Sequence, residues 1–271
     1  MKTTKIFYFS GTGNCLKCAK EIADGLGEGT EVISIPSIMH SAPKKGAIRI
    51  VADRVVVIFP AYAYLAPVMV KKFLKRADIE CEHAAVFALY ATKTGGALKQ
   101  ARRLLKKAGA ENIYGAKIIS VENYVAIFGF PSEDEVQKKC AMQTEETRGH
   151  IVAIERGEAN ITKGFHPLSP IIGFLFGMLG RRVLKMRFKV HEDACNGCGV
   201  CVKVCPAKCI VIENGKAVFK KGCEHCQGCF NYCPKKALQF AKIKPDSDRY
   251  HHPDIECGEF GQCQCGESCG E

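Results

Sequence analysis

The sequence has no hydrophobic run long enough to cross a bilayer. The best apolar stretch, Pro167–Gly180, has 14 residues and is interrupted by Pro170, Gly173 and Gly177, whereas a spanning helix needs about 20 apolar residues. We therefore expect a buried or interfacial segment there and no transmembrane helix. The first residues, Met1–Phe9, are also too short for a secretory signal, because a glycine-rich turn follows them at once.

Cysteine is scarce over the first two thirds of the chain. Only four of the 17 cysteines precede Cys195, which argues against a secreted scaffold held together by disulfides. We expect a cytoplasmic, reducing compartment in which the thiols are available to bind metal. The chain also shows no pattern typical of a catalytic triad or of paired carboxylates, so hydrolysis is not the expected chemistry.

What is present suits a folded protein of two modest domains. The chain has 271 residues, of which 47% are hydrophobic and 25% charged, close to ordinary globular usage. Up to about residue 164, strand-like and helix-like segments alternate, which predicts a parallel sheet with helices on both faces. Strands are expected at Lys5–Ser10, Glu31–Pro36, Arg54–Pro60, Ala84–Thr92 and Ile113–Val121, and helices at Cys15–Leu26, Pro67–Arg76, Leu98–Ala108 and Ser132–Glu158. Ser132 and Glu135 have the spacing of a capping box at the start of the last helix.

Changes in composition divide the chain into four parts. Residues 1–164 form the α/β domain, 165–190 an apolar and then basic connector, 191–245 a cysteine-rich domain, and 246–271 an acidic, cysteine-rich tail. The connector carries five bases and no acid between Arg181 and Lys189. We expect its apolar part to pack at the domain junction; peripheral contact with a membrane surface is the alternative.

Two cysteine runs of identical spacing form the strongest motif in the chain. Each has the pattern C-x2-C-x2-C-x3-C followed by proline, and the second lies 28 residues after the first. The runs are Cys195, Cys198, Cys201 and Cys205, and Cys223, Cys226, Cys229 and Cys233. Zinc is the alternative to iron–sulfur clusters, since paired C-x2-C units also bind zinc, but this spacing, found twice, favours clusters. Cys209 lies outside the set and is expected to be a small buried side chain.

This repeat resembles the bacterial two-cluster ferredoxins over about 55 residues. The resemblance implies a small α+β domain with two 4Fe–4S clusters, each of which takes its fourth ligand from the other run. One cluster would be held by Cys195, Cys198, Cys201 and Cys233, and the other by Cys205, Cys223, Cys226 and Cys229.

A glycine-rich loop joins the first predicted strand to the first predicted helix. It runs Ser10-Gly11-Thr12-Gly13-Asn14-Cys15, and the backbone N–H groups that open a helix favour an anion such as phosphate. The loop lacks the third glycine of a dinucleotide fingerprint and the Gly-Lys-Ser/Thr ending of a Walker A loop. Cys15 and Cys18 also form a C-x2-C pair at this helix N-terminus, so a thiol-exchange site is an alternative.

The loop resembles the FMN-phosphate loop of flavodoxins, Ser/Thr-x-Thr-Gly-x-Ser/Thr. The resemblance implies a flavodoxin-like doubly wound parallel sheet with strand order 2-1-3-4-5, and FMN as a cofactor. Two further loops that end strands would hold the flavin ring. The residues expected to bind FMN are Ser10, Gly11, Thr12, Gly13, Asn14, Cys15, Pro60, Ala61, Tyr62, Thr92, Thr94, Gly95 and Gly96. Cys15 departs from the pattern, and a thiol is a poorer donor than the usual hydroxyl.

Over residues 1–255 the chain resembles a family of fused flavodoxin–ferredoxin proteins. Smaller marks also match, among them Glu122-Asn123-Tyr124 after the fifth strand and residues 249–253 after the second cysteine run. We expect residues 249–253 to be a strap packed on the flavodoxin-like domain; a partner surface is the alternative. The tail departs from the family and is expected to be disordered, with a small metal site as the alternative. Its cysteines are Cys257, Cys263, Cys265 and Cys269.

The chain is strongly basic. Its net charge is +11 overall and +17 before residue 246, which suits nucleic acid, an anionic membrane or an acidic protein. Two bound clusters with eight thiolates would remove about four positive charges. We therefore expect redox proteins with acidic surfaces as partners, and no nucleic acid.

Together these features predict an iron–sulfur flavoprotein that carries electrons between FMN and two 4Fe–4S clusters. FMN handles one or two electrons and each cluster handles one, so the protein would interconvert two-electron and one-electron transfer. The alternative is an FMN-dependent oxidoreductase that reduces a small molecule or quinone, with the clusters as its electron supply. A zinc protein that binds nucleic acid is a more distant third hypothesis.

Overall fold

The computed structural model describes residues 2–92, 94–125, 129–160, 188–241, 243 and 247–260. Its centre is a five-stranded parallel sheet in the order β2-β1-β4-β6-β7. The strands are β1 (Thr4–Tyr8), β2 (Thr30–Ser34), β4 (Arg54–Pro60), β6 (His83–Tyr90) and β7 (Ile113–Ile119). Counted along the sheet, this is the predicted order 2-1-3-4-5, so the expected doubly wound topology is confirmed.

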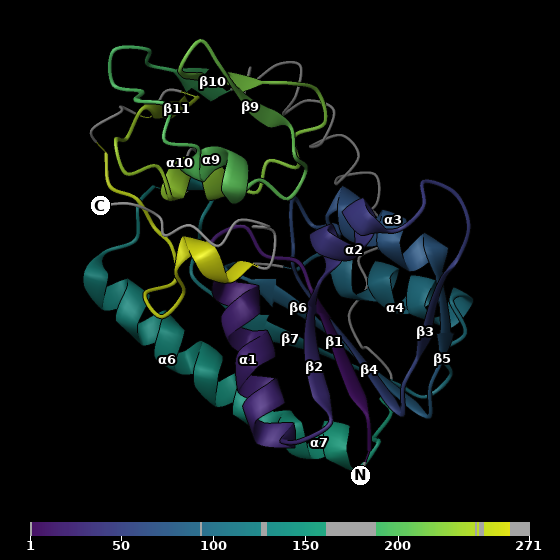
Figure 1. Ribbon diagram of the computed structural model, residues 1–271. Helices are drawn as coiled ribbons and strands as arrows, with labels where there is room; N and C mark the ends of the chain where they lie inside the picture. The colour runs from purple at the N-terminus through teal and green to yellow at the C-terminus, as the bar shows by residue number, and fades with distance from the viewer. Residues whose placement is uncertain are drawn as a thin grey trace.

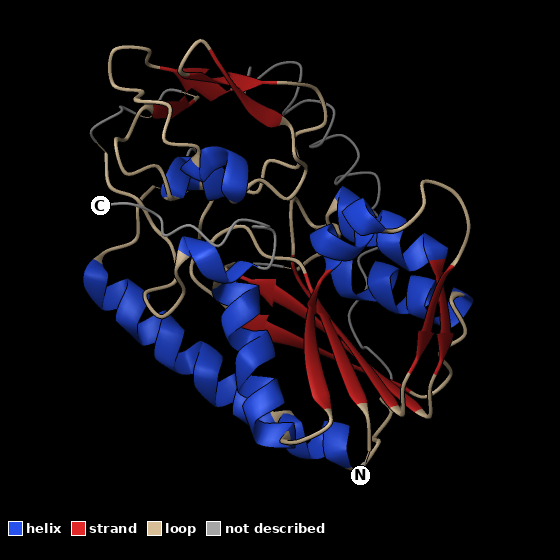
Figure 2. Ribbon diagram, in the orientation of Figure 1, coloured by secondary structure: helices blue, strands red, loops and turns tan. Residues whose placement is uncertain are grey.

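Helices cover both faces of this sheet, as Figures 1 and 2 show. One face packs against α1 (Asn14–Leu26), α6 (Glu133–Gly149) and α7 (Ile151–Glu155), and the other against α2 (Ile35–Ser41), α3 (Val68–Arg76) and α4 (Ala97–Lys107). Alternation along β1 explains the two cores, because Ile6 and Tyr8 enter the α1 side whereas Phe7 and Phe9 enter the α3 side. Within the described residues, no helix is long and apolar enough to cross a membrane.

The sequence prediction misses some elements of this domain. β3 (Ile48–Val51) and β5 (Ala77–Glu80) form a separate parallel pair beside the main sheet, and each has only four residues. The single long helix expected from Ser132 is divided into α6 and α7 at Gly149-His150, where glycine weakens the helix. Its predicted start is correct, because the Ser132 hydroxyl accepts a hydrogen bond from the backbone N–H of Glu135 at 3.2 Å.

The cysteine-rich domain is built from two copies of one unit. The first copy is β8 (Phe188–Val190), α9 (Val200–Lys203) and β9 (Ile210–Glu213), and the second is β10 (Lys216–Phe219), α10 (Gly228–Asn231) and β11 (Leu238–Phe240). The elements of the second copy start 28 residues after those of the first, which matches the spacing of the cysteine runs. The copies interlock, since β9 pairs with β10 and β8 with β11, both antiparallel.

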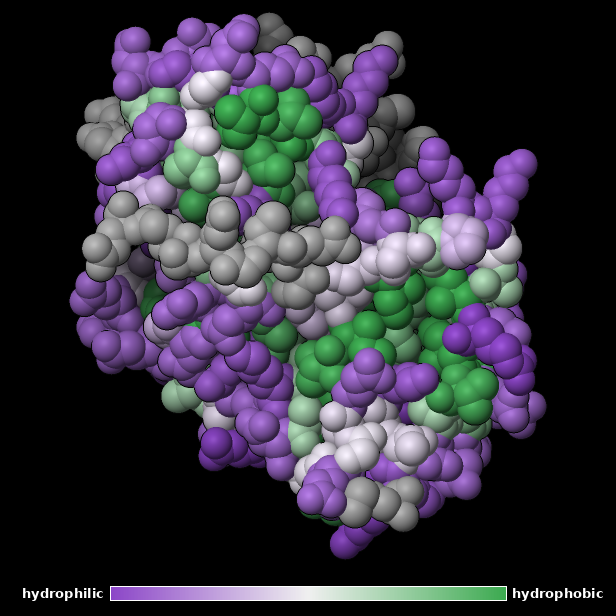
Figure 3. Space-filling view, in the orientation of Figure 1, coloured by the Kyte–Doolittle hydropathy of each residue, from purple (hydrophilic) through white to green (hydrophobic). Residues whose placement is uncertain are grey.

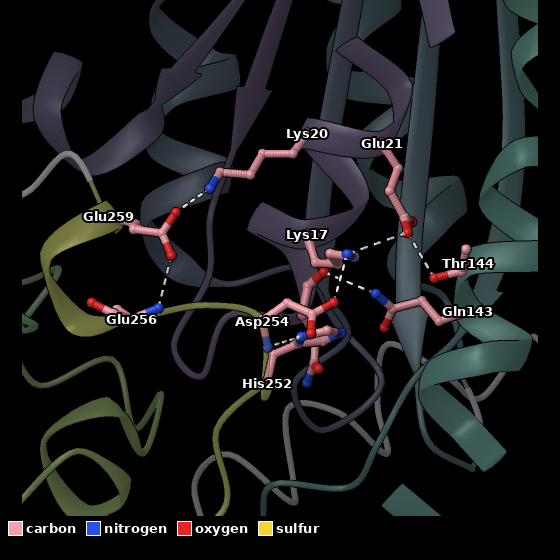
Figure 4. Close-up of polar contacts among 10 residues, drawn as sticks. Lys17, Lys20, Glu21, Gln143, Thr144, His252, Asp254, Glu256 and Glu259 are labelled. Atoms are coloured by element: carbon pink, nitrogen blue, oxygen red, sulfur yellow. Dashed lines mark hydrogen bonds and ion pairs between the residues drawn. The ribbon is translucent and has the colours of Figure 1, made fainter. Parts of the chain in front are cut away.

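The C-terminal segment 247–260, which includes the short helix η1 (Cys257–Phe260), packs against α1 (Figure 1). The backbone N–H of His252 donates to the carbonyl oxygen of Thr12 at 2.7 Å, so the predicted strap is present. Lys17 pairs with Asp254 at 2.6 Å, and Lys20 pairs with Glu259 (Figure 4). The expectation of a disordered tail is therefore wrong for residues 247–260, the segment called the strap from here on, because its residues Asp254 and Glu259 form ion pairs with lysines of α1.

Several predictions fall on residues outside the described part of the chain. They concern the packing or membrane contact of the connector, of which only residues 188–190 are described, and the role of Cys263, Cys265 and Cys269. Cys257 is described and lies half-buried at the edge of the hydrophobic core. The domain boundaries stay predictions.

Candidate iron–sulfur sites and glycine loop

Four thiols from the two runs surround one pocket of the cysteine-rich domain. Its lining includes Cys195, Cys198, Cys201 and Cys233, which are the predicted ligands of the first cluster. Burial, and then the neighbouring Cys233, Cys198 and Cys195, raise the pKa of the Cys201 thiol to about 12. Such a group of thiols needs bound cations to become thiolate.

The second predicted set also comes together. Burial raises the pKa of the Cys229 thiol well above its usual range, and the next contributions come from Cys226, Cys223 and Cys205. Cys226 and Cys229 are buried, and Cys205 is 7% exposed. Cys233 thus lies with three cysteines of the first run, and Cys205 lies near three cysteines of the second; the crosswise ligand assignment stays a prediction.

The thiols in each set are spread apart. No three cysteine, histidine or carboxylate side chains of the described residues converge closely enough to share one metal ion. A four-iron cube suits a wider arrangement, because its irons occupy separate corners and each binds one thiolate. The residues present therefore fit 4Fe–4S clusters.

Cys209 lies against the second set of thiols. Its Sγ atom is 3.6 Å from that of Cys205, and it is only 3% exposed. Hydrogen bonds from Cys209 lower the pKa of Cys205 and of Cys223, whereas the pKa of Cys209 itself is raised. Cys209 thus lies beside two expected ligands, Cys205 and Cys223, and its predicted burial is confirmed.

Left-handed backbone turns shape both ligand runs. Gly197 and Gly199 have φ values of 72° and 78° in the first run, and His225 and Gln227 have 56° and 64° at the equivalent positions of the second. A non-glycine residue in this conformation costs about 1–2 kcal/mol. The second run carries this strain, which indicates that its backbone path is fixed by its surroundings.

The predicted FMN loops gather at the carboxyl edge of the sheet, below the cysteine-rich domain (Figure 1). Ser10–Cys15 follows β1, Pro60–Tyr62 ends and follows β4, and Thr92–Gly96 follows β6. Thr92 is exposed, whereas Thr94 is 3% exposed. The topology thus brings the three loops together as expected.

The glycine loop itself is covered by protein. Every residue of Ser10–Cys15 is buried, with Ser10 and Thr12 both 1% exposed. The Ser10 hydroxyl accepts from the N–H of Gly13 at 3.1 Å, and the Thr12 hydroxyl accepts from Nδ2 of Asn123 at 3.1 Å. The oxygen atoms expected to meet a phosphate are therefore occupied by groups of the chain.

Two segments of the chain, the second cysteine run and the C-terminal segment 247–260, cover the glycine loop. A Cβ atom on Gly11 would lie 2.2 Å from the carbonyl oxygen of Cys226, and one on Gly13 would lie 2.9 Å from the Cβ of His252. The Tyr250 hydroxyl also donates to Oδ1 of Asn14 at 2.6 Å. The residue types of the loop suit FMN, but this arrangement leaves no room for its phosphate.

The two loops expected to hold the flavin ring are joined to each other. The N–H of Gly96 donates to the carbonyl oxygen of Tyr64 at 3.0 Å, and a Cβ on Gly95 would lie 2.3 Å from the Cβ of Tyr64. The Tyr62 side chain is partly buried, and the pKa of its hydroxyl is raised by burial and then by Cys226 and Cys15. The loops therefore touch where a ring would lie between them.

The thiol-exchange alternative at the start of α1 does not suit this structure. Cys15 and Cys18 are 2% and 0% exposed. Burial raises the pKa of Cys18 to about 12 and that of Cys15 well above its usual range. An exchange site needs an accessible thiolate, and these two side chains are instead part of the core.

Sequence reasoning missed the residues that join the two domains. Nε2 of His40 on α2 donates to the carbonyl oxygen of Pro206 at 2.8 Å. A carboxylate oxygen of Glu224 accepts from the backbone N–H of Val68 at 3.0 Å, at the start of α3. His40 belongs to no motif and Glu224 fills a variable position of the second cysteine run, so the cysteine spacing marks neither residue.

Comparison with known proteins gives one family match. Residues 188–211 match the 4Fe-4S binding domain family, which confirms the predicted iron–sulfur domain over the first cysteine run. A search of curated proteins finds no match.

Solved structures resemble the N-terminal half. The flavodoxin of Streptococcus pneumoniae TIGR4 is 18% identical, with coverage of 56% of this chain and 98% of that chain and a TM-score of 0.34. The Megasphaera elsdenii flavodoxin is 16% identical, with coverage of 54% and 99% and a TM-score of 0.32. An azoreductase of Bacillus anthracis str. Sterne is 11% identical, with coverage of 55% and 98% and a TM-score of 0.38. Because the identities and TM-scores are this low, the assignment of the fold depends on the strand order of the sheet and not on these structures.

The strand order defines the N-terminal fold, and the family match identifies a 4Fe-4S binding domain at residues 188–211. The chain is thus a fusion of a flavodoxin-like α/β domain with a ferredoxin-type 4Fe–4S domain.

Proposed function

We propose that this protein is an electron carrier that holds two 4Fe–4S clusters in its ferredoxin-type domain. The proposal is supported by the repeated cysteine run, by the interlocked 28-residue units, and by the pocket lined by Cys195, Cys198, Cys201 and Cys233. A bound cluster would supply one-electron transfer. The chain contributes the thiols, the backbone turns that place them, and the surrounding apolar shell.

The first set of thiols offers a route to the surface. Cys198 is exposed, whereas Cys226 and Cys229 of the second set are 7% and 6% exposed. The ferredoxin-type domain, residues 188–241, carries eight lysines and four acidic residues. We expect a redox partner with an acidic surface to approach on the side of the first set, because opposite charges speed encounter. Figure 3 shows hydrophobic side chains among hydrophilic ones on this domain.

Iron and sulfide analysis of anaerobically purified protein tests the proposal. Two clusters predict about eight irons and eight sulfides per chain, and two one-electron reductions that can be followed by electron paramagnetic resonance (EPR). About four irons would reduce the proposal to one cluster. A colourless protein with bound zinc would contradict it.

An FMN-linked carrier is the second candidate, because α1 begins at a glycine N-cap, and among the described residues no cap side chain bonds the N–H groups that open this helix. FMN bound there would let the chain interconvert two-electron and one-electron transfer. This function requires the cover of Ser10–Cys15 to open, and reduction of a small molecule or quinone would require space over the ring as well. Flavin analysis after the protein has been offered FMN distinguishes these forms from a flavin-free carrier.

A further inference from the structure

The second cluster site is attached to the flavodoxin-like domain at several points. His40 donates to the carbonyl oxygen of Pro206, which follows the expected ligand Cys205. Glu224, which follows the expected ligand Cys223, accepts from the N–H of Val68. These contacts come from α2 and α3, two separate elements of the α/β domain. The chain next to two expected ligands of the second cluster, Cys205 and Cys223, is therefore held by two separate contacts.

The backbones of the glycine loop and of the second ligand run lie too close together to leave room for a side chain between them. A Cβ on Gly11 would overlap the carbonyl oxygen of Cys226, and a Cβ on Gly228 would lie 2.7 Å from the carbonyl oxygen of Gly11. The φ value of Gly11 is not in the left-handed region. Glycine is therefore required here by close approach and not by backbone conformation.

Hydrophobic contacts continue across this boundary. The core on the α1 side of the sheet includes Tyr8 and Phe87 from the α/β domain, Phe230 and Phe240 from the ferredoxin-type domain, and Phe260 from the strap. Cys226 belongs to the core on the opposite face, beside Phe9 and Phe59. The two domains thus share their cores, which is the arrangement expected of a fixed interface.

The first cluster site differs sharply from the second. Every residue that lines its pocket lies between Cys195 and Leu238, within the ferredoxin-type domain. The position equivalent to Glu224 is Asn196, whose side chain accepts from the N–H of Cys198 in its own run. The repeat therefore has one face turned to the flavodoxin-like domain and one face independent of it.

We infer that the glycine loop Ser10–Cys15 holds the ligand run of the second cluster in the place where a flavodoxin holds phosphate, so that the flavodoxin-like domain forms one wall of that cluster and excludes FMN. The inference rests on the proposed two-cluster function and deepens it. The first cluster is then the exchange point with partners, and the second is the sheltered one.

Alanine at position 11 tests this contact. Gly11→Ala adds one methyl group that must displace the Cys226 carbonyl, so we expect the iron content to fall from about eight toward about four per chain, with one EPR signal altered or lost. Gly149→Ala is the matched control, because a Cβ there meets nothing within 4 Å and its φ is not left-handed. Both variants are purified anaerobically as full chains.

A second variant tests the same site in case Gly11→Ala fails to fold. His40→Ala removes the bond to Pro206 from an element distant in sequence, and we expect a shift in the EPR signal or midpoint potential of one cluster only. His40→Gln, which can still donate, should restore much of the wild-type signal. If the EPR signals of both clusters in Gly11→Ala and in His40→Ala were the same as in the wild type, the inference would be overturned.

FMN itself supplies the remaining test. Titration of FMN into the wild-type protein with intact clusters should leave flavin fluorescence unquenched and yield no bound flavin after gel filtration. One FMN per chain would overturn the inference while leaving the two-cluster function intact. The iron count of the wild-type protein tests that function separately, so the two failures are distinguishable.

Discussion

The hydroxyl of Tyr250 donates a 2.6 Å hydrogen bond to Oδ1 of Asn14, the first residue of α1, across 236 positions of sequence. Both side chains are buried, at 5% and 6% exposure. Asn14 in turn accepts at its backbone oxygen from Nε2 of Gln143 on α6. One residue of the glycine loop therefore ties the strap to two helices.

Tyr250→Phe should lower the free energy of unfolding by about 1–3 kcal/mol, because it leaves a buried amide oxygen without its donor. Denaturant unfolding under anaerobic conditions measures the change. Tyr90→Phe is the control, since the Tyr90 hydroxyl has no hydrogen bond with another described residue. A cost at position 250 no larger than at position 90 would contradict the role of this bond.

The strap should also respond to pH through His252. Burial lowers its pKa to about 4, and Nδ1 accepts from the N–H of Asp254 at 3.2 Å, which requires the neutral ring. An unfolded histidine titrates near 6.5, so between these values the folded chain binds fewer protons. The stabilisation is complete above about pH 6.5 and is lost toward pH 4, by at most about 1.4 kcal/mol per pH unit.

Unfolding of the wild type and of His252→Gln at pH 7 and pH 5 measures this effect. The free energy of unfolding should fall more for the wild type than for the variant over that interval. The part of the fall that both proteins share reflects the effect of pH on the bound clusters. Equal slopes for the wild type and His252→Gln would show that His252 titrates normally.

Gly13→Ala tests the contact between glycine loop and strap. Gly13 has a φ of 97°, and its Cβ would meet the Cβ atoms of His252 and Ile255 at 2.9 Å. Gly46 has nearly the same φ, 100°, with nothing within 4 Å, so Gly46→Ala carries the backbone strain alone. We expect faster hydrogen exchange in residues 247–260 for Gly13→Ala only; equal protection in both variants would refute the contact.

Cys209→Ala should leave the iron content unchanged. Cys209 stands 28 residues before Ala237, which lines the first cluster pocket, so alanine already serves at the equivalent position. Cys205→Ala is the comparison variant and should lose iron, because it removes an expected ligand. Iron per chain after anaerobic purification measures both, and loss of a cluster in Cys209→Ala would make that thiol a ligand.

Residues whose role depends on nearby sequence were predicted well. The strands were predicted from buried runs such as Arg54–Pro60, and their order from the resemblance of the glycine loop to flavodoxins. The cysteine repeat was found from its spacing, whereas the crosswise ligand sets follow from the resemblance to two-cluster ferredoxins and stay a prediction. The closure of Ser10–Cys15 was not predicted, because it depends on Cys226 and His252, more than 200 residues away. Glycine at position 11 reads as a phosphate-loop residue in sequence, whereas in the structure it allows the Cys226 carbonyl to approach.

The strap has a consequence for the order of events during synthesis. Domains fold as they emerge from the ribosome, the N-terminal one first, and the elements of the α/β domain are complete at Glu155. Tyr250 and His252 follow about ninety residues later. For that interval the nascent chain presents an uncovered glycine loop, so any ion or nucleotide that can enter it has its opportunity before translation ends.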